Sequence, residues 1–274
     1  MGRIVAGIDV GSRMTKALLL EEDGAGTGFG AILARASTVT GAWFARAAET
    51  AFAQALAQAG LAREQVAYVV STGYGRTQVP FRDLQLTEIT SHATGAVRLF
   101  PLTRTVLDVG AQNARAIQVT EEGRVKSFRM NDKCASGTGR FLERVARALE
   151  VELDEIGPLS LRSREPRQIS SICAVLAESE VINLVTQDAP IEDILRGTHL
   201  SISERLMGLV RQVGVRPEVT LTGGVTKNPG LVKALEERLG LPLNVCADSE
   251  YAGTLGAALL GFVRLRKKEK ETAA

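Results

Sequence analysis

The sequence predicts an α/β protein built from two related lobes, and three observations lead to this prediction. Short apolar runs typical of buried strands alternate with segments of helical periodicity. A strand–Asp-Val-Gly–strand unit occurs at Asp9 and again at Asp108, 99 residues later (108 minus 9). At 274 residues the chain is long enough for one large or two small domains. A duplicated α/β lobe accounts for all three observations.

The composition is that of an ordinary globular enzyme and argues against several other classes. Hydrophobic residues make up 45% of the chain and charged residues 23%, which is too apolar for a disordered protein. A net charge of +2 and 4% aromatic residues argue against a nucleic-acid partner. No apolar run reaches the roughly 18 residues of a membrane helix, and Asp9 comes too early for a signal peptide. We expect a cytoplasmic protein with reduced thiols and no membrane partner.

The first lobe is expected to span residues 1–100. Strands are predicted at 4–8, 17–20 and 66–71, and a helix at 42–59 that Gly60 ends. The first two strands form a hairpin, because only a short Gly/Ser turn joins them. The glycine-rich stretch 24–30 is interpreted as a further turn; a dinucleotide fingerprint is the less favoured alternative, since no acidic residue follows at the required distance. A C-terminal helix at 252–274 is expected to pack back on this lobe.

The second lobe is expected to span residues 101–251. Strands are predicted at 105–107, 116–119 and 219–221, and the helices are expected at 137–150, 174–186, 191–213 and 231–239. Its hairpin contains Asp108-Val109-Gly110-Ala111, which matches the first hairpin in position and in pattern.

Each Asp-Val-Gly hairpin has the chemistry of a phosphate site. Glycine lets backbone N–H groups approach a phosphate, and Lys16 adds a positive charge to the hydroxyls of Ser12 and Thr15. Asp9 and Asp108 could hold Mg²⁺ through water, because magnesium keeps most of its hydration shell. A tight turn without a ligand is the alternative for either hairpin alone. A third glycine loop at a strand end, 221–225, favours the nucleotide interpretation.

This arrangement of three loops resembles the superfamily of actin, sugar kinases and Hsp70-type ATPases. The resemblance implies a duplicated ribonuclease-H-like fold with ATP in the central cleft, two phosphate hairpins and a later adenosine loop. The catalytic residues would be Asp9, Asp108 and Gln112, with Gln112 orienting the attacking water. The nucleotide-binding residues would be Gly11, Ser12, Thr15, Lys16, Gly110, Ala111, Gly137, Gly139, Gly223, Gly224, Val225 and Lys227.

Two of the three cysteines suit a shared metal centre. Cys134 and Cys173 lie at predicted helix starts, where the helix dipole favours a thiolate. Neither has a Cys-x-x-Cys neighbour, so one chain cannot supply four thiolates, whereas two chains with two each match the ligand set of a [4Fe–4S] cluster. From spacing alone, two ordinary buried cysteines remain the alternative.

The segments around these cysteines, 131–140 and 169–180, resemble a narrower family, as do 7–12, 87–93 and 252–258. It contains the activators of 2-hydroxyacyl-CoA dehydratases and the ATP-hydrolysing subunits of benzoyl-CoA reductase. The resemblance implies a [4Fe–4S] cluster that Cys134 and Cys173 share with a second ATPase subunit, identical or homologous. It also implies catalytic iron–sulfur reductase or dehydratase subunits as partners and reduced ferredoxin or flavodoxin as donor. Cys246 matches no ligand position and is expected to be a packed strand cysteine. His92 is expected to be a structural residue, with a catalytic role as the alternative.

Positions at which this sequence differs from the motifs of the dehydratase activators indicate the subfamily. Ala111 and Asn113 depart from the activators, and Ala111, 115–117 and 172–176 are similar to the smaller ATPase subunit of benzoyl-CoA reductases. The segment 131–134 is closer to the activators and to the larger reductase subunit. We favour the reductase type. A dehydratase activator stays open, as do a small-molecule kinase of the same superfamily and an Hsp70-like ATPase without redox chemistry.

Overall fold

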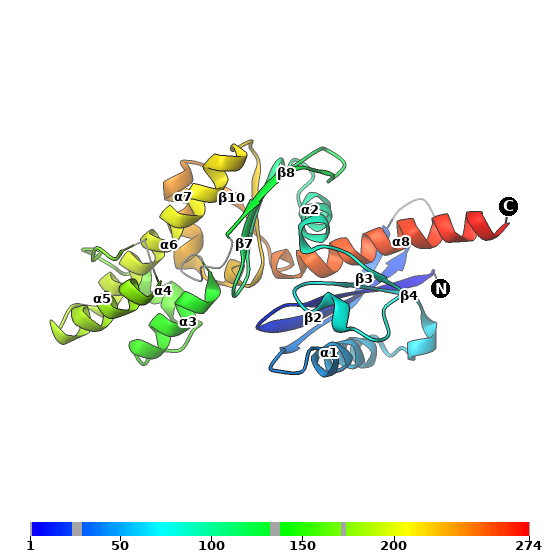
Figure 1. Ribbon diagram of the computed structural model, residues 1–274, viewed down its shortest axis with the longest axis horizontal. Coiled ribbons are helices and arrows are strands. Elements are labelled where there is room, and N and C mark those ends of the chain that lie inside the picture. Colours follow the sequence, from blue (N-terminus) through cyan, green and yellow to red (C-terminus); the bar gives the residue numbers. More distant parts are fainter. Residues whose placement is uncertain (1, 24–28, 132–137, 171–173, 274) are drawn as a thin grey trace. The chain divides into compact units, whose positions relative to one another are not determined.

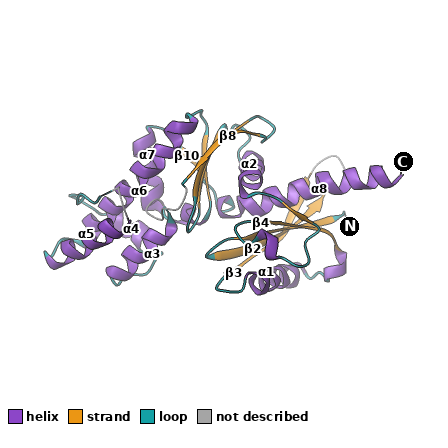
Figure 2. Ribbon diagram, in the orientation of Figure 1, coloured by secondary structure: helices purple, strands orange, loops and turns teal. Residues whose placement is uncertain are grey.

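The computed structural model describes residues 2–23, 29–131, 138–170 and 174–273. The chain divides into two compact units. The first comprises Met1–Pro101, Thr120–Val125 and Tyr251–Ala274, and the second Leu102–Val119 and Lys126–Glu250. Each unit holds one five-stranded sheet with helices (Figures 1 and 2), and the predicted α/β class is confirmed.

The first sheet has the strand order β3-β2-β1-β4-β5. Strand β1 pairs antiparallel with β2 and parallel with β4, so the sheet is mixed. Its strands are β1 (Ile4–Val10), β2 (Met14–Glu22), β3 (Phe29–Val39), β4 (Val66–Thr72) and β5 (Leu84–Gln85). The helices of this unit are α1 (Phe44–Ala59), α2 (Glu88–Leu99) and α8 (Ala252–Ala273).

The alternation of side chains along β1 decides what lies on each face of this sheet. Ile8 and its even-numbered neighbours pack with α1 around the buried ring of Phe52. Val5 points to the other face, where it joins the cluster formed with Phe262 of α8. Asp9 shares the odd-numbered face of Val5, and α8 and α2 contact each other in this unit. The strand period therefore places the Asp9 carboxylate on the α8 side of the sheet.

The second sheet has the order β10-β9-β6-β7-β8, which repeats the first topology. Strand β6 pairs antiparallel with β7 and parallel with β9, as β1 does with β2 and β4. The strands are β6 (Thr105–Val109), β7 (Ala114–Val119), β8 (Val125–Met130), β9 (Val219–Thr222) and β10 (Leu243–Asn244). The helices are α3 (Gly139–Ala148), α4 (Ile156–Ser160), α5 (Ala174–Thr186), α6 (Ile191–Val213) and α7 (Pro229–Leu239).

Several elements were not anticipated from the sequence. Strand β3 has exposed polar positions and lies at the edge of the sheet, so its apolar alternation is weak. Helix α2 contains glycine, threonine and histidine, which are weak helix formers, and it begins where the hydroxyl of Thr87 accepts a hydrogen bond from the Thr90 amide. Strands β5, β8 and β10 and the short helix α4 were missed as well.

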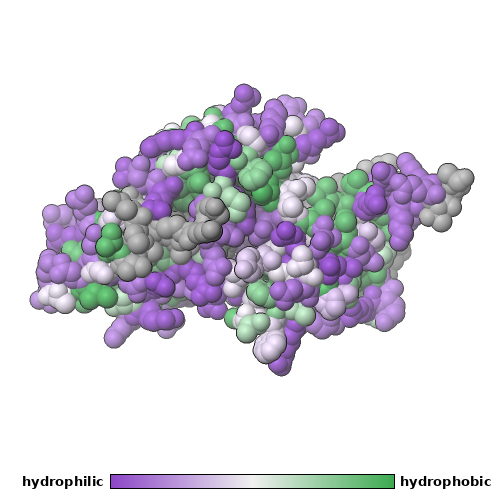
Figure 3. Space-filling view, viewed as in Figure 1, coloured by the Kyte–Doolittle hydropathy of each residue, from purple (hydrophilic) through white to green (hydrophobic). Residues whose placement is uncertain are grey.

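Polar and apolar residues share the visible surface unequally. On the face drawn in Figure 3, hydrophilic residues predominate and hydrophobic ones gather in small groups. Helix α5 exposes Leu176, Ile182 and Val185, which makes it one place where apolar side chains meet solvent. Across the described part of the chain, every helix is too short or too polar to cross a membrane.

Candidate functional site

The two Asp-Val-Gly hairpins have the same backbone geometry. In the first hairpin Asp9 lies opposite Lys16, and in the second Asp108 lies opposite Arg115. The amide of Gly11 donates to the Met14 carbonyl at 3.1 Å, and the amide of Gly110 donates to the Asn113 carbonyl at 2.8 Å. Every one of these positions is displaced by 99 residues between the hairpins (for example 115 minus 16). In both copies of the repeat, an aspartate on one strand of the hairpin therefore lies opposite a positively charged residue on the other strand.

A glycine with left-handed backbone lies against each of the two carboxylates. Gly73 follows β4 and Gly223 follows β9, and both have φ of +93°. A side chain at Gly73 would collide with the Asp9 carboxylate, and a Cβ at Gly223 would lie 2.9 Å from Asp108 Oδ1. Glycine is needed here both for the positive φ and for the close approach.

In the first unit, the Asp9 carboxylate lies near groups from four elements, α2, α8, β2 and β4. His92 of α2 is buried, and its Nε2 lies 3.9 Å from Asp9 Oδ2. A Cβ at Gly253 of α8 would lie 2.9 Å from the same oxygen. Lys16 is buried, with its ammonium 5.8 Å from the centre of the Tyr251 ring, a cation–π arrangement. Thr72 lies opposite Asp9 on β4, and its buried hydroxyl has no hydrogen-bond partner among the described residues.

In the second unit, the Asp108 carboxylate is already neutralised. Arg115 donates to Asp108 Oδ2 at 2.7 Å, and the side chains of both residues are about 95% buried. The hydroxyl of Thr222 donates to Asp108 Oδ1 at 3.3 Å. The two halves of the repeat therefore differ in chemistry: Asp108 is paired with a guanidinium, whereas Asp9 faces an imidazole at a longer distance.

The polar side chains at the two hairpin turns differ in how far they are exposed to solvent. The hydroxyl of Thr40 donates to the Gly11 carbonyl, so the bond of 2.9 Å between Thr15 and Thr40 has Thr15 as its donor. Thr15 is fully buried and holds the turn, while Ser12 is half-buried. Gln112 is exposed at the tip of the second hairpin.

The second hairpin is bonded directly to the start of helix α3. The amide of Gly139 donates to the Gly110 carbonyl at 3.0 Å, and the amide of Arg140 donates to the Ala111 carbonyl at 2.9 Å. These first amides of a helix have no partner inside the helix, so the hairpin supplies it. The structure thus brings together Gly110, Ala111 and Gly139, three of the residues that the sequence assigned to the nucleotide.

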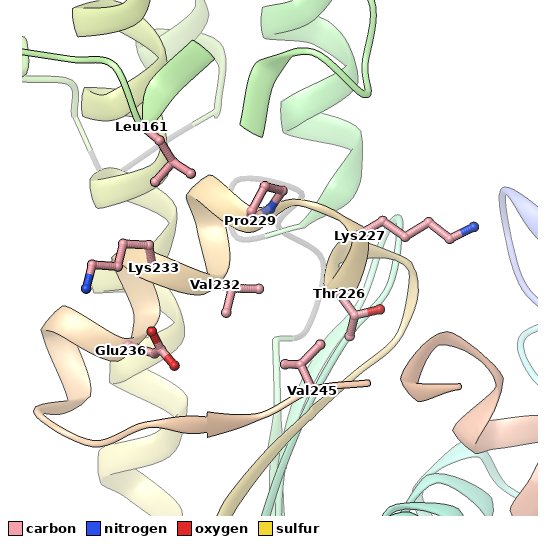
Figure 4. A pocket seen from close by; sticks show the side chains of 8 residues that line it. All are labelled: Leu161, Thr226, Lys227, Pro229, Val232, Lys233, Glu236 and Val245. Atoms are coloured by element: carbon pink, nitrogen blue, oxygen red, sulfur yellow. The ribbon is translucent and has the colours of Figure 1, made fainter. Parts of the chain in front are cut away.

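The third glycine loop leads from β9 into α7. Gly223 is followed by a short 3₁₀ turn, Gly224–Lys227, and then by Asn228, whose side chain caps α7. Val225 is buried, and Lys227 forms an ion pair of 2.7 Å with Glu250. A groove of about 470 Å³ lies beside this loop (Figure 4), and Lys227 extends away from the other side chains drawn there. Its lining residues are Leu161, Thr226, Lys227, Pro229, Val232, Lys233, Glu236 and Val245.

Of the three cysteines, the structure describes Cys246 alone. Cys134, Cys173 and Gly137 lie outside the described residues. The helices that follow the two cysteines, α3 and α5, contact each other, and Arg144 donates to Glu178 between them at 3.0 Å. Cys246 is exposed and lies beyond the end of β10, so the expectation of a packed strand cysteine is wrong. Within the described ranges no three His, Cys, Asp or Glu side chains gather as a metal site would require.

Sequence reasoning missed several residues that contact this site. Strand β4 ends at Thr72 and is followed by Gly73, as β9 ends at Thr222 and is followed by Gly223, so a comparison of the two strand ends would have found the first pair. Extending the 99-residue repeat by a few positions would have matched Arg115 with Lys16. Gly253 lies in the segment 252–258 that carries the family resemblance, but its contact with Asp9 depends on the packing of α8.

The two sheets of matching topology and the repeated hairpins are those of the actin, Hsp70 and sugar-kinase class of ATPases. A solved structure with this fold is MreB 5 of Spiroplasma citri, which is 13% identical to this chain with a TM-score of 0.52 over the full length of both chains. At this identity the likeness concerns the fold alone.

The chain belongs to the BadF/BadG/BcrA/BcrD ATPase family, whose model matches residues 6–261. It is 38% identical to the activator of 2-hydroxyisocaproyl-CoA dehydratase from Clostridium difficile, solved with bound ADPNP; the TM-score is 0.90, over 98% of this chain and 97% of that one. It is 41% identical over 270 residues to a benzoyl-CoA reductase subunit of Thauera aromatica, over 96% of this chain and 95% of that protein. The family resemblance expected from the sequence is confirmed.

The buried Asp108–Arg115 pair predicts a specific pattern of stability. Arg115→Leu should lower the free energy of unfolding by about 3–5 kcal/mol, because it leaves a buried carboxylate without a counter-charge. The double variant Asp108→Leu/Arg115→Leu should lose clearly less, since both charges are removed together. Urea unfolding followed by circular dichroism measures both values. Equal losses in the single and the double variant would contradict this account of the pair.

Proposed function

We propose that this chain hydrolyses ATP and couples the hydrolysis to the transfer of single low-potential electrons to a catalytic partner. The observation that carries the proposal is the pair of hydrogen bonds from the Gly139 and Arg140 amides to the Gly110–Ala111 hairpin. They join the proposed phosphate hairpin to the helix that follows Cys134. A change in the hairpin on hydrolysis would therefore reach the cysteine-bearing part of the second unit. Membership in an ATPase family supports the first half of the proposal.

The residues of the first unit suit a hydrated magnesium ion and a phosphate. The Asp9 carboxylate is partly exposed, and the unpartnered Thr72 hydroxyl lies on the neighbouring strand. Mg²⁺ is held through one or two carboxylates and keeps several waters, so it does not need a larger cluster of acidic ligands. Asp9 would hold the ion, Lys16 would bind the phosphates, and Gln112 would orient the attacking water. Asp108 would join Asp9 at the ion only by exchanging its bond to Arg115. Mg²⁺, when bound, neutralises the charge that develops on the phosphates.

The remaining residues would hold the rest of the nucleotide. The proposed phosphate contacts are the backbone groups of Gly11, Thr15, Gly110, Ala111, Gly137 and Gly139 and the backbone and hydroxyl of Ser12. Gly223, Gly224, Val225 and Lys227 would contact the adenosine, next to the groove in Figure 4. The left-handed Gly223 beside Asp108 supports this, since it lets the loop backbone lie open to a ligand.

We assign Cys134 and Cys173 as this chain's two ligands to a [4Fe–4S] cluster that a second ATPase subunit, identical or homologous, completes. The packing of α3 on α5 supports the assignment, because these helices begin shortly after the two cysteines. The exposed side chains of Leu176, Ile182 and Val185 on α5 would be covered by the second subunit. The cluster, when bound, supplies one-electron chemistry at low potential, with reduced ferredoxin or flavodoxin as the proposed donor.

Within the family we propose the small ATPase subunit of a benzoyl-CoA reductase as the particular role. Arg115, one of the positions that resemble that subunit, is the residue that neutralises Asp108. A dehydratase activator is the second candidate, and a specific observation favours it: residues 131–134 resemble the activators, and such an activator is among the similar structures.

The two roles predict different acceptors. The protein is purified without oxygen, reduced, and mixed with MgATP and either the catalytic subunits of a benzoyl-CoA reductase or a 2-hydroxyacyl-CoA dehydratase component. For the reductase role we expect ATP-dependent loss of benzoyl-CoA, with at least tenfold less activity on the dehydratase component. The reverse preference would establish the activator role. A colourless protein whose ATP consumption rises with a sugar or an organic acid would contradict both.

The cluster ligands are tested by iron content. Cys134→Ser should reduce the iron from about two atoms per chain, half of a [4Fe–4S] cluster, to near zero, while ADP binding measured by calorimetry stays within about twofold. Cys246→Ser is the matched control, because this thiol is exposed and outside any disulfide, and it should keep its iron. Full iron in Cys134→Ser would remove Cys134 from the ligand set.

A further inference from the structure

Helix α6 carries a buried histidine that lies outside the two hairpins. His199 is completely buried in the second unit, and both of its ring nitrogens have partners. Nδ1 lies 2.8 Å from the hydroxyl of Ser160 at the end of α4, and Nε2 lies 3.0 Å from the side-chain amide of Asn228. His199 therefore joins three elements, α4, α6 and the start of α7, which also contact one another.

The partners of the ring fix the direction of each hydrogen bond. Asn228 Oδ1 accepts from the Leu231 amide at 2.9 Å, so Asn228 presents its NH₂ group to the histidine, and Nε2 must accept. The hydroxyl of Ser160 donates to the Gly157 carbonyl at 3.0 Å, so its oxygen accepts from Nδ1–H. The ring is thus the neutral Nδ1–H tautomer. Burial, with a smaller contribution from Arg196, lowers the pKa of His199 to about 3, in agreement with a neutral ring.

Asn228 is the residue at which the third glycine loop becomes α7. The backbone amide of Asn228 donates to the Val225 carbonyl at 2.9 Å, inside the loop. The side chain of Asn228 caps the helix. There is little space for it to move: a Cβ at Gly157 would lie 2.8 Å from Asn228 Oδ1, and one at Gly230 would lie 2.8 Å from His199 Nδ1. The orientation of Asn228, and with it the C-terminal end of the loop, is therefore set by the acceptor on His199.

Helix α6 also bonds to the backbone of Ser170, which precedes the second cysteine in the chain. The hydroxyl of Ser201, two residues after His199, donates to the Ser170 carbonyl at 2.8 Å. The Ser170 amide donates to Glu180 of α5 at 2.6 Å. One stretch of α6 is thus bonded both to the third glycine loop and to residues that precede α5.

We propose that His199 is a positioning residue for the adenine nucleotide: its Nε2 acceptor holds the 223–228 loop in the binding conformation and links that loop through α6 to the backbone at Ser170. The inference rests on the proposed nucleotide-binding role of the loop. His199 acts through Asn228 and has no assigned contact with the nucleotide itself. Its contribution is to keep one loop conformation populated before the ligand arrives.

A pair of amide substitutions separates the two ring nitrogens. His199→Gln places an acceptor near the position of Nε2, and His199→Asn keeps only a donor near that of Nδ1. We expect the Kd for ADP, from calorimetry on the full-length protein, to rise about tenfold in His199→Asn, the size of one lost buried hydrogen bond, and to stay within about twofold in His199→Gln. Rescue by the glutamine is an effect that a purely structural role of the ring would not produce.

Two further variants keep the test decisive. Asn228→Ser retains a good helix cap but removes the amide that donates to His199, so its Kd should rise as in His199→Asn even if the latter folds poorly. Ser203→Ala is the control: it removes a buried hydroxyl of α6 whose bond to the Leu200 carbonyl stays inside the helix, and its Kd should not change.

The link to Ser170 is read by hydrogen–deuterium exchange. In the wild-type protein ADP should slow exchange in peptides covering 223–228 and 167–170, and in His199→Asn, saturated with ADP, the second effect should disappear. Wild-type protein that binds no adenine nucleotide would contradict the proposed function itself. Wild-type and His199→Asn proteins that bind ADP equally well, or equal exchange at 167–170, would overturn the inference on His199 alone.

Discussion

The site depends on one constraint, the placement of a carboxylate at the end of the central strand of each sheet, directly against a glycine. A Cβ at Gly73 or Gly223 would run into the carboxylate, and both glycines have a backbone that other residues adopt at a cost. A carboxylate held at such a place needs a compensating charge or solvent. Asp108 has Arg115 at 2.7 Å, whereas Asp9 keeps partial exposure near His92. The duplication therefore produced two matching backbones with unequal chemistry, which favours Asp9 as the more available carboxylate.

The second unit contains two physical connections from the glycine loops toward the cysteine segments. One is the pair of bonds between the Gly110–Ala111 hairpin and the first amides of α3. The other runs from the 223–228 loop through His199 and α6 to Ser170. Helices α3 and α5 contact each other, so the two connections end on packed neighbours. Hydrogen bonds to backbone groups can switch between two discrete sets of partners. Such bonds are suited to transmit a conformational change that depends on the nucleotide.

The fold class could be predicted from the sequence because the repeated Asp-Val-Gly hairpin and the strand periods are local patterns. Strand β3 and helix α2 escaped prediction because edge pairing and packing, rather than periodicity or propensity, stabilise them. In the site, the positions of Asp9 and Asp108 followed from the motif. The Arg115 pairing, the Gly253 contact and the His199 bonds depend on residues far apart in the chain, and a single sequence does not show which distant residues meet. Cys246 was placed in a strand that ends before it.

The central claim is the proposal that the state of the nucleotide changes the surroundings of Cys134 and Cys173, the proposed cluster ligands. The most direct measurement is the electron paramagnetic resonance spectrum of the anaerobically reduced protein, recorded once with MgADP and once with a non-hydrolysable ATP analogue. The account predicts a cluster signal whose line shape or g values differ between the two nucleotides. A cluster signal that is identical with both nucleotides, at saturating concentration of each, would contradict it.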